Sequence, residues 1–189
     1  MKNIVVFASG SGTNFQSLID ATVSGKIKAG ICGLIAGKPG IEAIKRAERA
    51  SIPVRILSSK SPGYQDEMLI QLEKWDPDLI VLAGYLTKLP EIIVEKYSRK
   101  IINIHPSLLP KYGGHGFYGM RVHRAVLESG DPESGCTVHY VTDEYDEGPV
   151  IAQRKVPVKP GDSPENLAKR VLEEEHKLLP EVVSKILNI

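Results

Sequence analysis

The sequence has few cysteines and no long apolar run. Its two cysteines, Cys32 and Cys136, lie in apolar segments without a Cys-x-x-Cys spacing. We therefore expect two buried free thiols rather than a disulfide or a zinc site. No apolar stretch approaches the ~20 residues of a membrane span, and the first apolar run is too short for a signal peptide. These absences predict a cytoplasmic protein that has no membrane partner.

An excess of basic charge is also missing. Lys and Arg number 24 against 23 Asp and Glu, which gives a net charge of +1. A nucleic-acid-binding protein usually carries a basic excess, and the single Trp75 and scattered tyrosines form no stacking array. We expect no nucleic-acid partner. A small anionic ligand stays compatible with this balance, because it needs only a local site.

Short apolar runs alternate with helical patterns along the first hundred residues. Apolar runs without polar alternation are typical of strands buried on both sides of a parallel sheet. The spacing predicts a doubly wound α/β fold, with a mostly parallel twisted sheet and helices on both of its faces. The expected strands are 4–8, 31–36, 54–57, 79–83 and 101–104, and the expected helices are 15–23, 41–50, 64–74 and 90–97.

The pattern changes after residue 110. A glycine-rich loop at 111–120 precedes a helix at 121–128, and strands at 137–141 and 150–158 have a hairpin-like relation. Asp162 and Ser163 offer N-caps to a long final helix, which we expect to end near Leu187.

A glycine loop, Ser9-Gly10-Ser11-Gly12-Thr13-Asn14, follows the first expected strand. Glycines let backbone amides approach a ligand, and the helix N-terminus beyond them favours an anion. We therefore expect this loop to bind a phosphate. The loop lacks the third glycine of the dinucleotide fingerprint and the Gly-Lys-Ser/Thr of a Walker loop. The alternative interpretation is a tight strand-to-helix turn without a ligand.

Asn103-Ile104-His105-Pro106 ends the fifth expected strand. Because side chains alternate along a strand, Asn103 and His105 share one face. Two polar groups at the end of a buried strand are costly unless they are satisfied or used, and ligands bind at this edge of open α/β sheets. An Asn amide can donate to an oxyanion and a His can move a proton, which fits acyl transfer. The alternative is a core histidine bonded to a backbone carbonyl.

Four carboxylates lie between the last two expected strands, in the segment Thr142 to Pro149. A solvated turn is the default interpretation, and the spacing does not fit a calcium loop. A carboxylate facing His105 would raise the pKa of that histidine. His139 suits either core or site, whereas His115, His123 and His176 have no partners at metal-ligand spacing. We expect no metal.

Taken together, these segments resemble the folate-dependent glycinamide ribonucleotide formyltransferases. The matching segments are GSGTN, LAGYLTKL, INIHPSLLPKY, VHYVTDEYDEGPVIAQ and EEEHKLLP, in the order of that family and across nearly the whole chain. The resemblance implies a Rossmann-like formyltransferase fold in one domain, 1–189. Its first half, 1–100, would bind phosphate, and its second half, 101–189, would hold the catalytic and folate-binding residues.

The resemblance also implies an activity: transfer of the formyl group of 10-formyltetrahydrofolate, a co-substrate, to the amine of glycinamide ribonucleotide in purine synthesis. Oligomeric state stays open between monomer and homodimer. The implied catalytic residues are Asn103, His105 and Asp146. The implied ribonucleotide-binding residues are Gly10, Ser11, Gly12, Thr13, Asn14 and Glu175. The implied folate-binding residues are Leu86, Thr87, Lys88, Leu89, Asn103, Val141 and Asp143.

Two segments depart from the family pattern. Thr87 stands where the family often has Arg, and a second folate-contacting Arg near Ser61 is missing, for which Lys60 or Lys88 are candidate substitutes. The segment Lys111 to His123 is longer than in many relatives by a few residues, and its glycines predict a mobile flap.

Three other functions share part of the pattern. Hydrolysis of 10-formyltetrahydrofolate uses the same Asn-Ile-His-Pro-Ser core, usually with an N-terminal regulatory domain. Formylation of methionyl-tRNA requires a second, nucleic-acid-binding domain. A non-catalytic nucleotide sensor would bind the ligands without consuming formyl-folate. The sequence shows neither additional domain, so we expect the ribonucleotide transferase.

Overall fold

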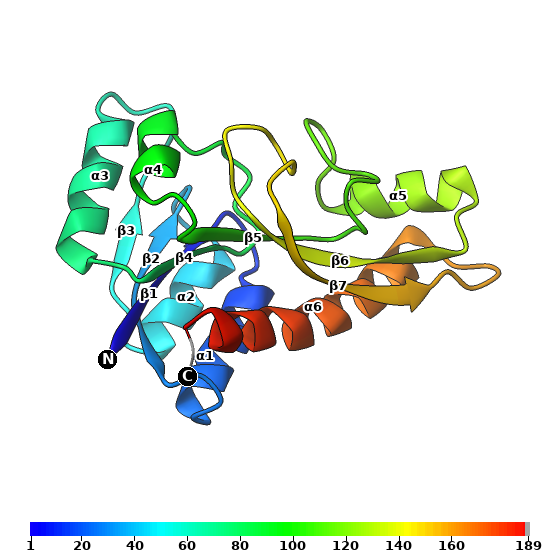
Figure 1. Ribbon diagram of the computed structural model, residues 1–189, viewed down its shortest axis with the longest axis horizontal. Coiled ribbons are helices and arrows are strands. Elements are labelled where there is room, and N and C mark those ends of the chain that lie inside the picture. Colours follow the sequence, from blue (N-terminus) through cyan, green and yellow to red (C-terminus); the bar gives the residue numbers. More distant parts are fainter. Residues whose placement is uncertain (188–189) are drawn as a thin grey trace.

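The computed structural model describes residues 1–187 and contains every helix and strand expected from the sequence (Figure 1). Residues 188–189, the last two of the predicted second half 101–189, lie outside the described residues. The strands are β1 (Lys2–Ala8), β2 (Ala29–Ala36), β3 (Val54–Ile56), β4 (Leu79–Leu82), β5 (Ile101–His105), β6 (Glu133–Tyr140) and β7 (Val150–Pro157). The helices are α1 (Thr13–Val23), α2 (Glu42–Arg49), α3 (Tyr64–Trp75), α4 (Glu91–Lys96), α5 (Met120–Ser129) and α6 (Pro164–Leu187).

The strands form one sheet in the order β3-β2-β1-β4-β5-β6-β7. The strands from β3 to β5 are parallel, and β6 and β7 join antiparallel, so the predicted mostly parallel sheet is confirmed. The chain runs outward from β1 to β3 and then returns to β4 on the other side of β1. The carboxyl ends of β1 and β4 therefore flank the point where strand order reverses, which is where open α/β sheets bind ligands.

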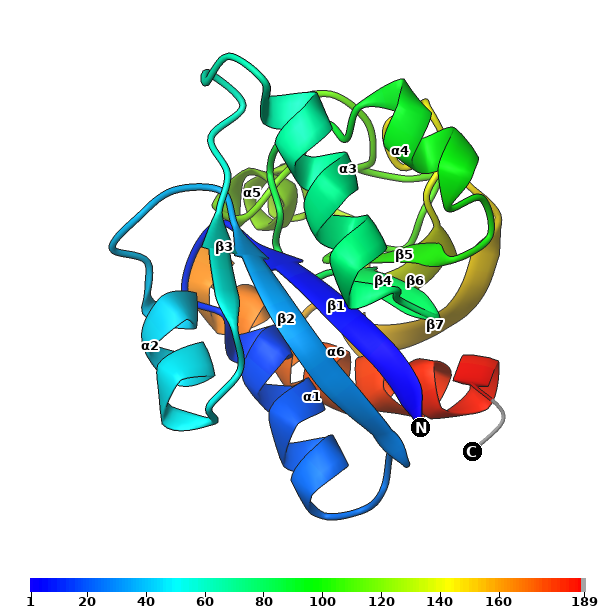
Figure 2. The ribbon, with the colours of Figure 1, turned by 90° about the vertical axis from the view of Figure 1, so that its left-hand side faces the viewer.

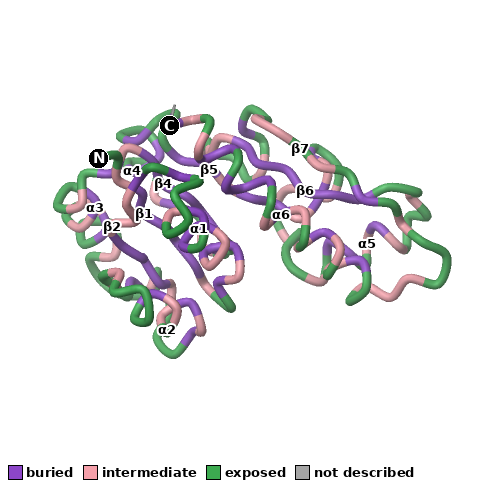
Figure 3. Tube along the Cα trace, turned by 90° about the horizontal axis from the view of Figure 1, so that it is seen from below, coloured by how far each residue is buried: buried purple, intermediate pink, exposed green. Residues whose placement is uncertain are grey.

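Helices cover both faces of the parallel part (Figure 2). Alternating side chains of β1 divide between the two cores: Ile4 and Val6 pack toward α1 and α6, whereas Val5 and Phe7 pack toward α3 and α4. The central strands are buried along most of their length (Figure 3). Rigid strands supported on both sides are well suited to hold catalytic side chains at their ends.

The final helix begins as its sequence predicts. The Ser163 hydroxyl accepts a hydrogen bond from the Asn166 N–H at 3.2 Å, so Ser163 is the cap. Asp162 instead accepts the Lys159 N–H and pairs with Arg170. This helix continues through Pro180 and packs against α1, β6 and β7.

Two expectations need correction. Strand β6 begins at Glu133, four residues before the expected Thr137, because its first residues pair with β7 alone. The sequence does not indicate this start, because Gly135 is a poor strand former. The close pairing requires glycine there, since a Cβ would lie 2.0 Å from the Arg154 carbonyl oxygen. Cys136 is buried as expected, but Cys32 is half-buried, with its Sγ 3.3 Å from the Ile4 carbonyl oxygen.

Candidate active site

One cavity of about 660 Å³ collects residues from distant parts of the chain. It opens at the carboxyl ends of β1, β4 and β5, in the position that the topology predicts. The glycine loop and Glu175 line this cavity together with the three predicted catalytic residues. From the sequence-predicted site it contains Gly10, Ser11, Gly12, Thr13, Asn14, Leu86, Asn103, His105, Asp146 and Glu175.

His105 is the last residue of β5 and is 4% exposed. Its Nε2 lies 2.8 Å from the Tyr112 carbonyl oxygen. Because a carbonyl only accepts, Nε2 carries the proton, and Nδ1 is left facing the Asp146 carboxylate at 3.4 Å. The interpretation as a histidine bonded to a backbone carbonyl therefore describes one side of the ring, and the other side faces a carboxylate in the cavity.

The Asp146 carboxylate raises the pKa of His105 as expected, but it is not the largest influence on that pKa. Burial lowers the pKa of this histidine, and this effect outweighs the opposing effects of Asp146 and the Tyr112 carbonyl. The pKa of His105 therefore stands below its usual range, so the carboxylate does not hold the ring protonated near neutral pH. A ring of this kind gives up a proton readily, which suits a group that passes protons onward.

Asn103 is held by a histidine that the sequence left unassigned. The Asn103 Nδ2 group donates to His139 Nε2 at 3.1 Å. His139 Nδ1 lies 2.9 Å from the Tyr140 carbonyl oxygen, which fixes Nδ1 as the protonated nitrogen and Nε2 as the acceptor. Asn103 also reaches Asp146 Oδ1 at 3.5 Å, the limit of a hydrogen bond. This weakly held N–H remains available to a reacting oxygen.

Asp146 lies in the acidic loop that joins β6 and β7, at a φ of 58°. Its Oδ2 accepts the Gly114 N–H at 3.0 Å, which links the acidic loop to the glycine-rich segment before α5. Burial raises the pKa of Asp146, but His139, His105 and the Gly114 N–H together hold it below its usual range. The sequence could not decide which acid faces His105, and the structure identifies Asp146.

The glycine loop forms the opposite end of the cavity. Gly12 adopts φ +68° and directly precedes α1, where its side-chain-free Cα packs against Ala43. The Asn14 amide donates to Glu175 Oε2 at 2.6 Å, so the start of α1 is joined to α6. An uncapped helix N-terminus that opens on a cavity can bind an anion, and the phosphate site stays a prediction.

Glu175 is buried within this cavity wall. Burial raises its pKa to about 7, against the opposing effect of the Asn14 hydrogen bond. In the unfolded chain the same group titrates near 4.5. The folded state therefore binds this proton more tightly, so the stability present below pH 4.5 is lost as the pH rises through about 7.

We accordingly expect Glu175→Gln to stabilise the protein in alkaline solution. The neutral amide keeps an oxygen for Asn14 but never carries a buried charge. At pH 8.5 its unfolding free energy should exceed that of wild type by about 3 kcal/mol, and the gain should nearly vanish at pH 4.5. Urea unfolding at both values measures this. Glu173→Gln, an exposed neighbour on α6, is the control; an equal gain for both variants would contradict the prediction.

Six of the seven predicted folate-binding residues line a smaller adjoining cavity of about 80 Å³, whereas Leu86 lines the larger cavity. Asn103 and Asp146 line both cavities, so the two spaces meet at two of the three predicted catalytic residues. The smaller cavity also contains Thr87, Lys88, Leu89, Val141 and Asp143. Asp143 Oδ1 is buried without a hydrogen-bond partner among the described residues. A free buried acceptor of this kind fits a ring that carries N–H donors, such as a pterin.

The glycine-rich segment contributes aromatic side chains to the larger cavity. Phe117 and Tyr118 line it and are partly exposed, and His115 contacts the Tyr145 ring edge-on at 6.0 Å between centroids. Lys88 lies over the same Tyr145 ring, 5.9 Å from its centroid. In Figure 1 the loop before α5 and the loop between β6 and β7, which carries Tyr145, rise side by side above the sheet.

Sequence reasoning also missed His123. This histidine is 4% exposed, lines the larger cavity and leaves Nδ1 without a partner among the described residues. Burial lowers its pKa to about 4, so the ring is neutral in the working range. On α5 it lies next to Val122 and three residues before Val126, which puts it on the apolar face of that helix. This helical pattern could have indicated its burial, whereas the spacing of metal ligands could not.

Within residues 1–187, no group of three or more His, Cys, Asp or Glu side chains could hold a metal ion. The expectation of a metal-free site stays a prediction. No described helix is both long and apolar enough to cross a membrane.

Comparison with known proteins decides the family. The sequence profile of the formyl transferases matches residues 2–183. The chain belongs to the formyl transferase family. This formyl transferase is 42% identical to the chloroplastic phosphoribosylglycinamide formyltransferase of Arabidopsis thaliana over 98% of its own length, and spans 65%, slightly less than two thirds, of that relative.

Two further formyl transferases match at similar identity. Phosphoribosylglycinamide formyltransferase of Escherichia coli K12 is 41% identical over 96% of this chain and 85% of its own length. The crystal structure of glycinamide ribonucleotide transformylase 1 from Geobacillus kaustophilus has a TM-score of 0.91 at 40% identity, and 99% of each chain is covered. The α/β formyltransferase fold expected from the sequence is therefore confirmed.

Proposed function

We propose that this formyl transferase moves the formyl group of 10-formyltetrahydrofolate to the amine of glycinamide ribonucleotide. One observation carries the proposal: a single cavity joins a phosphate-type loop at a helix N-terminus to Asn103, His105 and Asp146, and a second cavity meets it at Asn103 and Asp146. A phosphorylated acceptor and a folate donor would thus meet at the catalytic residues. The relatives named for this reaction support the choice.

The proposed reaction is a direct transfer. The substrate amine attacks the formyl carbon, and a tetrahedral intermediate carries negative charge on the former carbonyl oxygen. The Asn103 amide, held by His139 with its second N–H weakly engaged, would donate to that oxygen. The bond to the folate nitrogen then breaks, which leaves a formamide on the ribonucleotide.

A proton must leave the attacking amine and reach the departing folate nitrogen. His105 would carry it, directly or through a water ordered by Asp146, because its pKa is low enough to release the proton again. The Asp146 carboxylate would stabilise the imidazolium during the transfer, since it faces Nδ1 at 3.4 Å. The neighbouring Glu175 would bind the ribonucleotide beside the glycine loop.

In this proposal the two halves of the chain have different roles. Residues 1–100 supply the phosphate loop, and the half from residue 101 supplies Asn103, His105 and Asp146. Cytoplasmic location, a monomeric or homodimeric state, and the absence of nucleic-acid partners stay predictions of the sequence.

The test is a folate-release assay. Purified protein is mixed with 10-formyltetrahydrofolate, and folate absorbance is followed with and without glycinamide ribonucleotide. We expect release that depends on the ribonucleotide and yields its formyl product. Release at equal rates without the ribonucleotide would indicate a hydrolase, and binding of both ligands without release would indicate a sensor; either result would overturn the proposal.

A further inference from the structure

Helix α2 lies directly behind the glycine loop and binds two of its carbonyls. The Ala43 N–H, in the first turn of α2, donates to the Gly10 carbonyl oxygen at 3.2 Å. One turn further along, Arg46 Nε donates to the Ser11 carbonyl oxygen at 2.9 Å. Gly12 is in van der Waals contact with the same helix, because a Cβ at Gly12 would lie 2.7 Å from that of Ala43. The loop is therefore fixed from behind by α2.

These two bonds determine where the loop amides point. Both peptide bonds are trans, and in a trans peptide the C=O and N–H point in opposite directions. The Gly10 carbonyl and the Ser11 N–H belong to one peptide unit, and the Ser11 carbonyl and the Gly12 N–H belong to the next. Since both carbonyls point toward α2, both N–H groups point away from it, toward the cavity that the loop lines.

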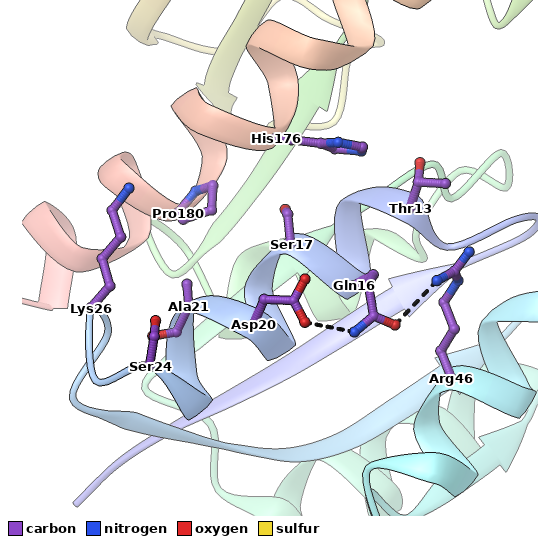
Figure 4. Close-up of a pocket in the computed structure, with 10 residues that line it drawn as sticks. All are labelled: Thr13, Gln16, Ser17, Asp20, Ala21, Ser24, Lys26, Arg46, His176 and Pro180. Carbon is purple, nitrogen blue, oxygen red and sulfur yellow. Dashed lines mark hydrogen bonds between the residues drawn. The ribbon is translucent and has the colours of Figure 1, made fainter.

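Arg46 itself lies outside that cavity. It lines a separate groove of about 620 Å³ between α1, α2 and α6 (Figure 4). Its Nη1 donates to Gln16 Oε1 at 3.1 Å, and Gln16 Nε2 donates to Asp20 at 2.8 Å. This chain along α1 holds the guanidinium in place while Nε binds Ser11. The cation also polarises the Ser11 peptide, which strengthens the Gly12 N–H as a donor.

We propose that Arg46 is a positioning residue for phosphate recognition: it holds the Ser11 carbonyl and so aims the Gly12 N–H at the ribonucleotide phosphate. The inference rests on the proposed function, because it takes the glycine loop as the phosphate site. Arg46 acts through the loop and does not touch the substrate. Loss of the side chain should therefore affect binding of the phosphorylated substrate and spare the chemical step.

The test compares three variants of the full chain. Arg46→Ala should raise KM for glycinamide ribonucleotide about tenfold, with kcat and the KM for 10-formyltetrahydrofolate within about twofold of wild type. Arg46→Lys should recover part of the loss, because an ammonium can still donate to Ser11. Arg49→Ala removes the same charge from the same helix and should change none of these constants, since Arg49 faces Glu42 instead.

A direct readout uses inorganic phosphate. Titration of ¹⁵N-labelled protein should shift the Gly12 amide resonance, and Arg46→Ala should weaken this response about tenfold. A rise in both KM values together, an equal effect of Arg49→Ala, or an unchanged phosphate response would overturn the role of Arg46. If wild type binds phosphate at the loop but shows no ribonucleotide-dependent turnover, the proposed function fails, and the phosphate comparison still decides the role of Arg46.

Discussion

His105→Ala is expected to lower kcat by about 10²-fold or more, because loss of a positioned acid–base group removes that much. Neither of the two other histidines nearby is suited to take over its task. The neighbouring His139 donates its Nδ1 proton to the Tyr140 carbonyl and uses Nε2 to accept from Asn103, so neither nitrogen is free to move a proton. His123 lines the same cavity, but a pKa near 4 makes it a weak base. The measurement is steady-state turnover at saturating concentrations of both substrates.

A control is needed because the alanine variant leaves the Tyr112 carbonyl with only the Ser107 hydroxyl, 3.5 Å away, as a donor. Urea unfolding should show that His105→Ala is still folded under assay conditions, and His105→Gln, which can still donate to that carbonyl, should lose similar activity. His176→Gln, in the groove behind α1, should stay within about twofold of wild type. Turnover near the wild-type level in both His105 variants would refute the role of this ring.

Gly148→Ala is expected to lower the unfolding free energy by about 3 kcal/mol, the upper part of the range for overpacking. Gly148 is buried at the end of the acidic loop, and a Cβ there would lie 1.7 Å from the Tyr140 carbonyl oxygen. That oxygen is backbone and cannot turn aside. The Tyr140 N–H also closes the loop by donating to the Pro149 carbonyl at 2.9 Å, so relief of the clash must move the loop.

Activity should fall with stability in this variant, since Asp146 lies two residues before Gly148 and its carboxylate contacts His105. Urea unfolding and turnover are measured on the same preparation. Gly30→Ala provides the control: its added Cβ meets Met1 at 3.6 Å, an ordinary contact, so its stability should change by less than about 0.5 kcal/mol. A Gly148→Ala variant as stable and active as Gly30→Ala would show that the loop adapts without strain.

The fold could be predicted from the sequence because local patterns decide most of it. Apolar runs such as Leu79–Leu82 have no polar alternation and are buried on both sides in the structure. Where the prediction was wrong, a partner strand overrides local preference. The start of β6 contains Ser134 and Gly135, poor strand formers that the pairing with β7 nevertheless holds extended.

The candidate site likewise has a part that the sequence predicts and a part that it does not. The shared face of Asn103 and His105 follows from strand geometry, so their neighbourhood was predictable. The partners of these residues come from other elements: His139 from β6, the Tyr112 carbonyl from a loop, and Asp146 from a turn. Their arrangement depends on tertiary contacts, and the lowered pKa of His105 depends on the depth of its burial, which no sequence pattern measures.

The hydrogen bond between Asn14 and Glu175 joins residues 161 positions apart. A ribosome that has just released the glycine loop must therefore synthesise most of the remaining chain before this contact can form. Until α6 docks, part of the cavity wall is missing, because Ala168, Leu172 and Glu175 of this helix line the cavity. A ligand that binds in this cavity would favour the docked helix by mass action and would slow hydrogen exchange of the α6 amides.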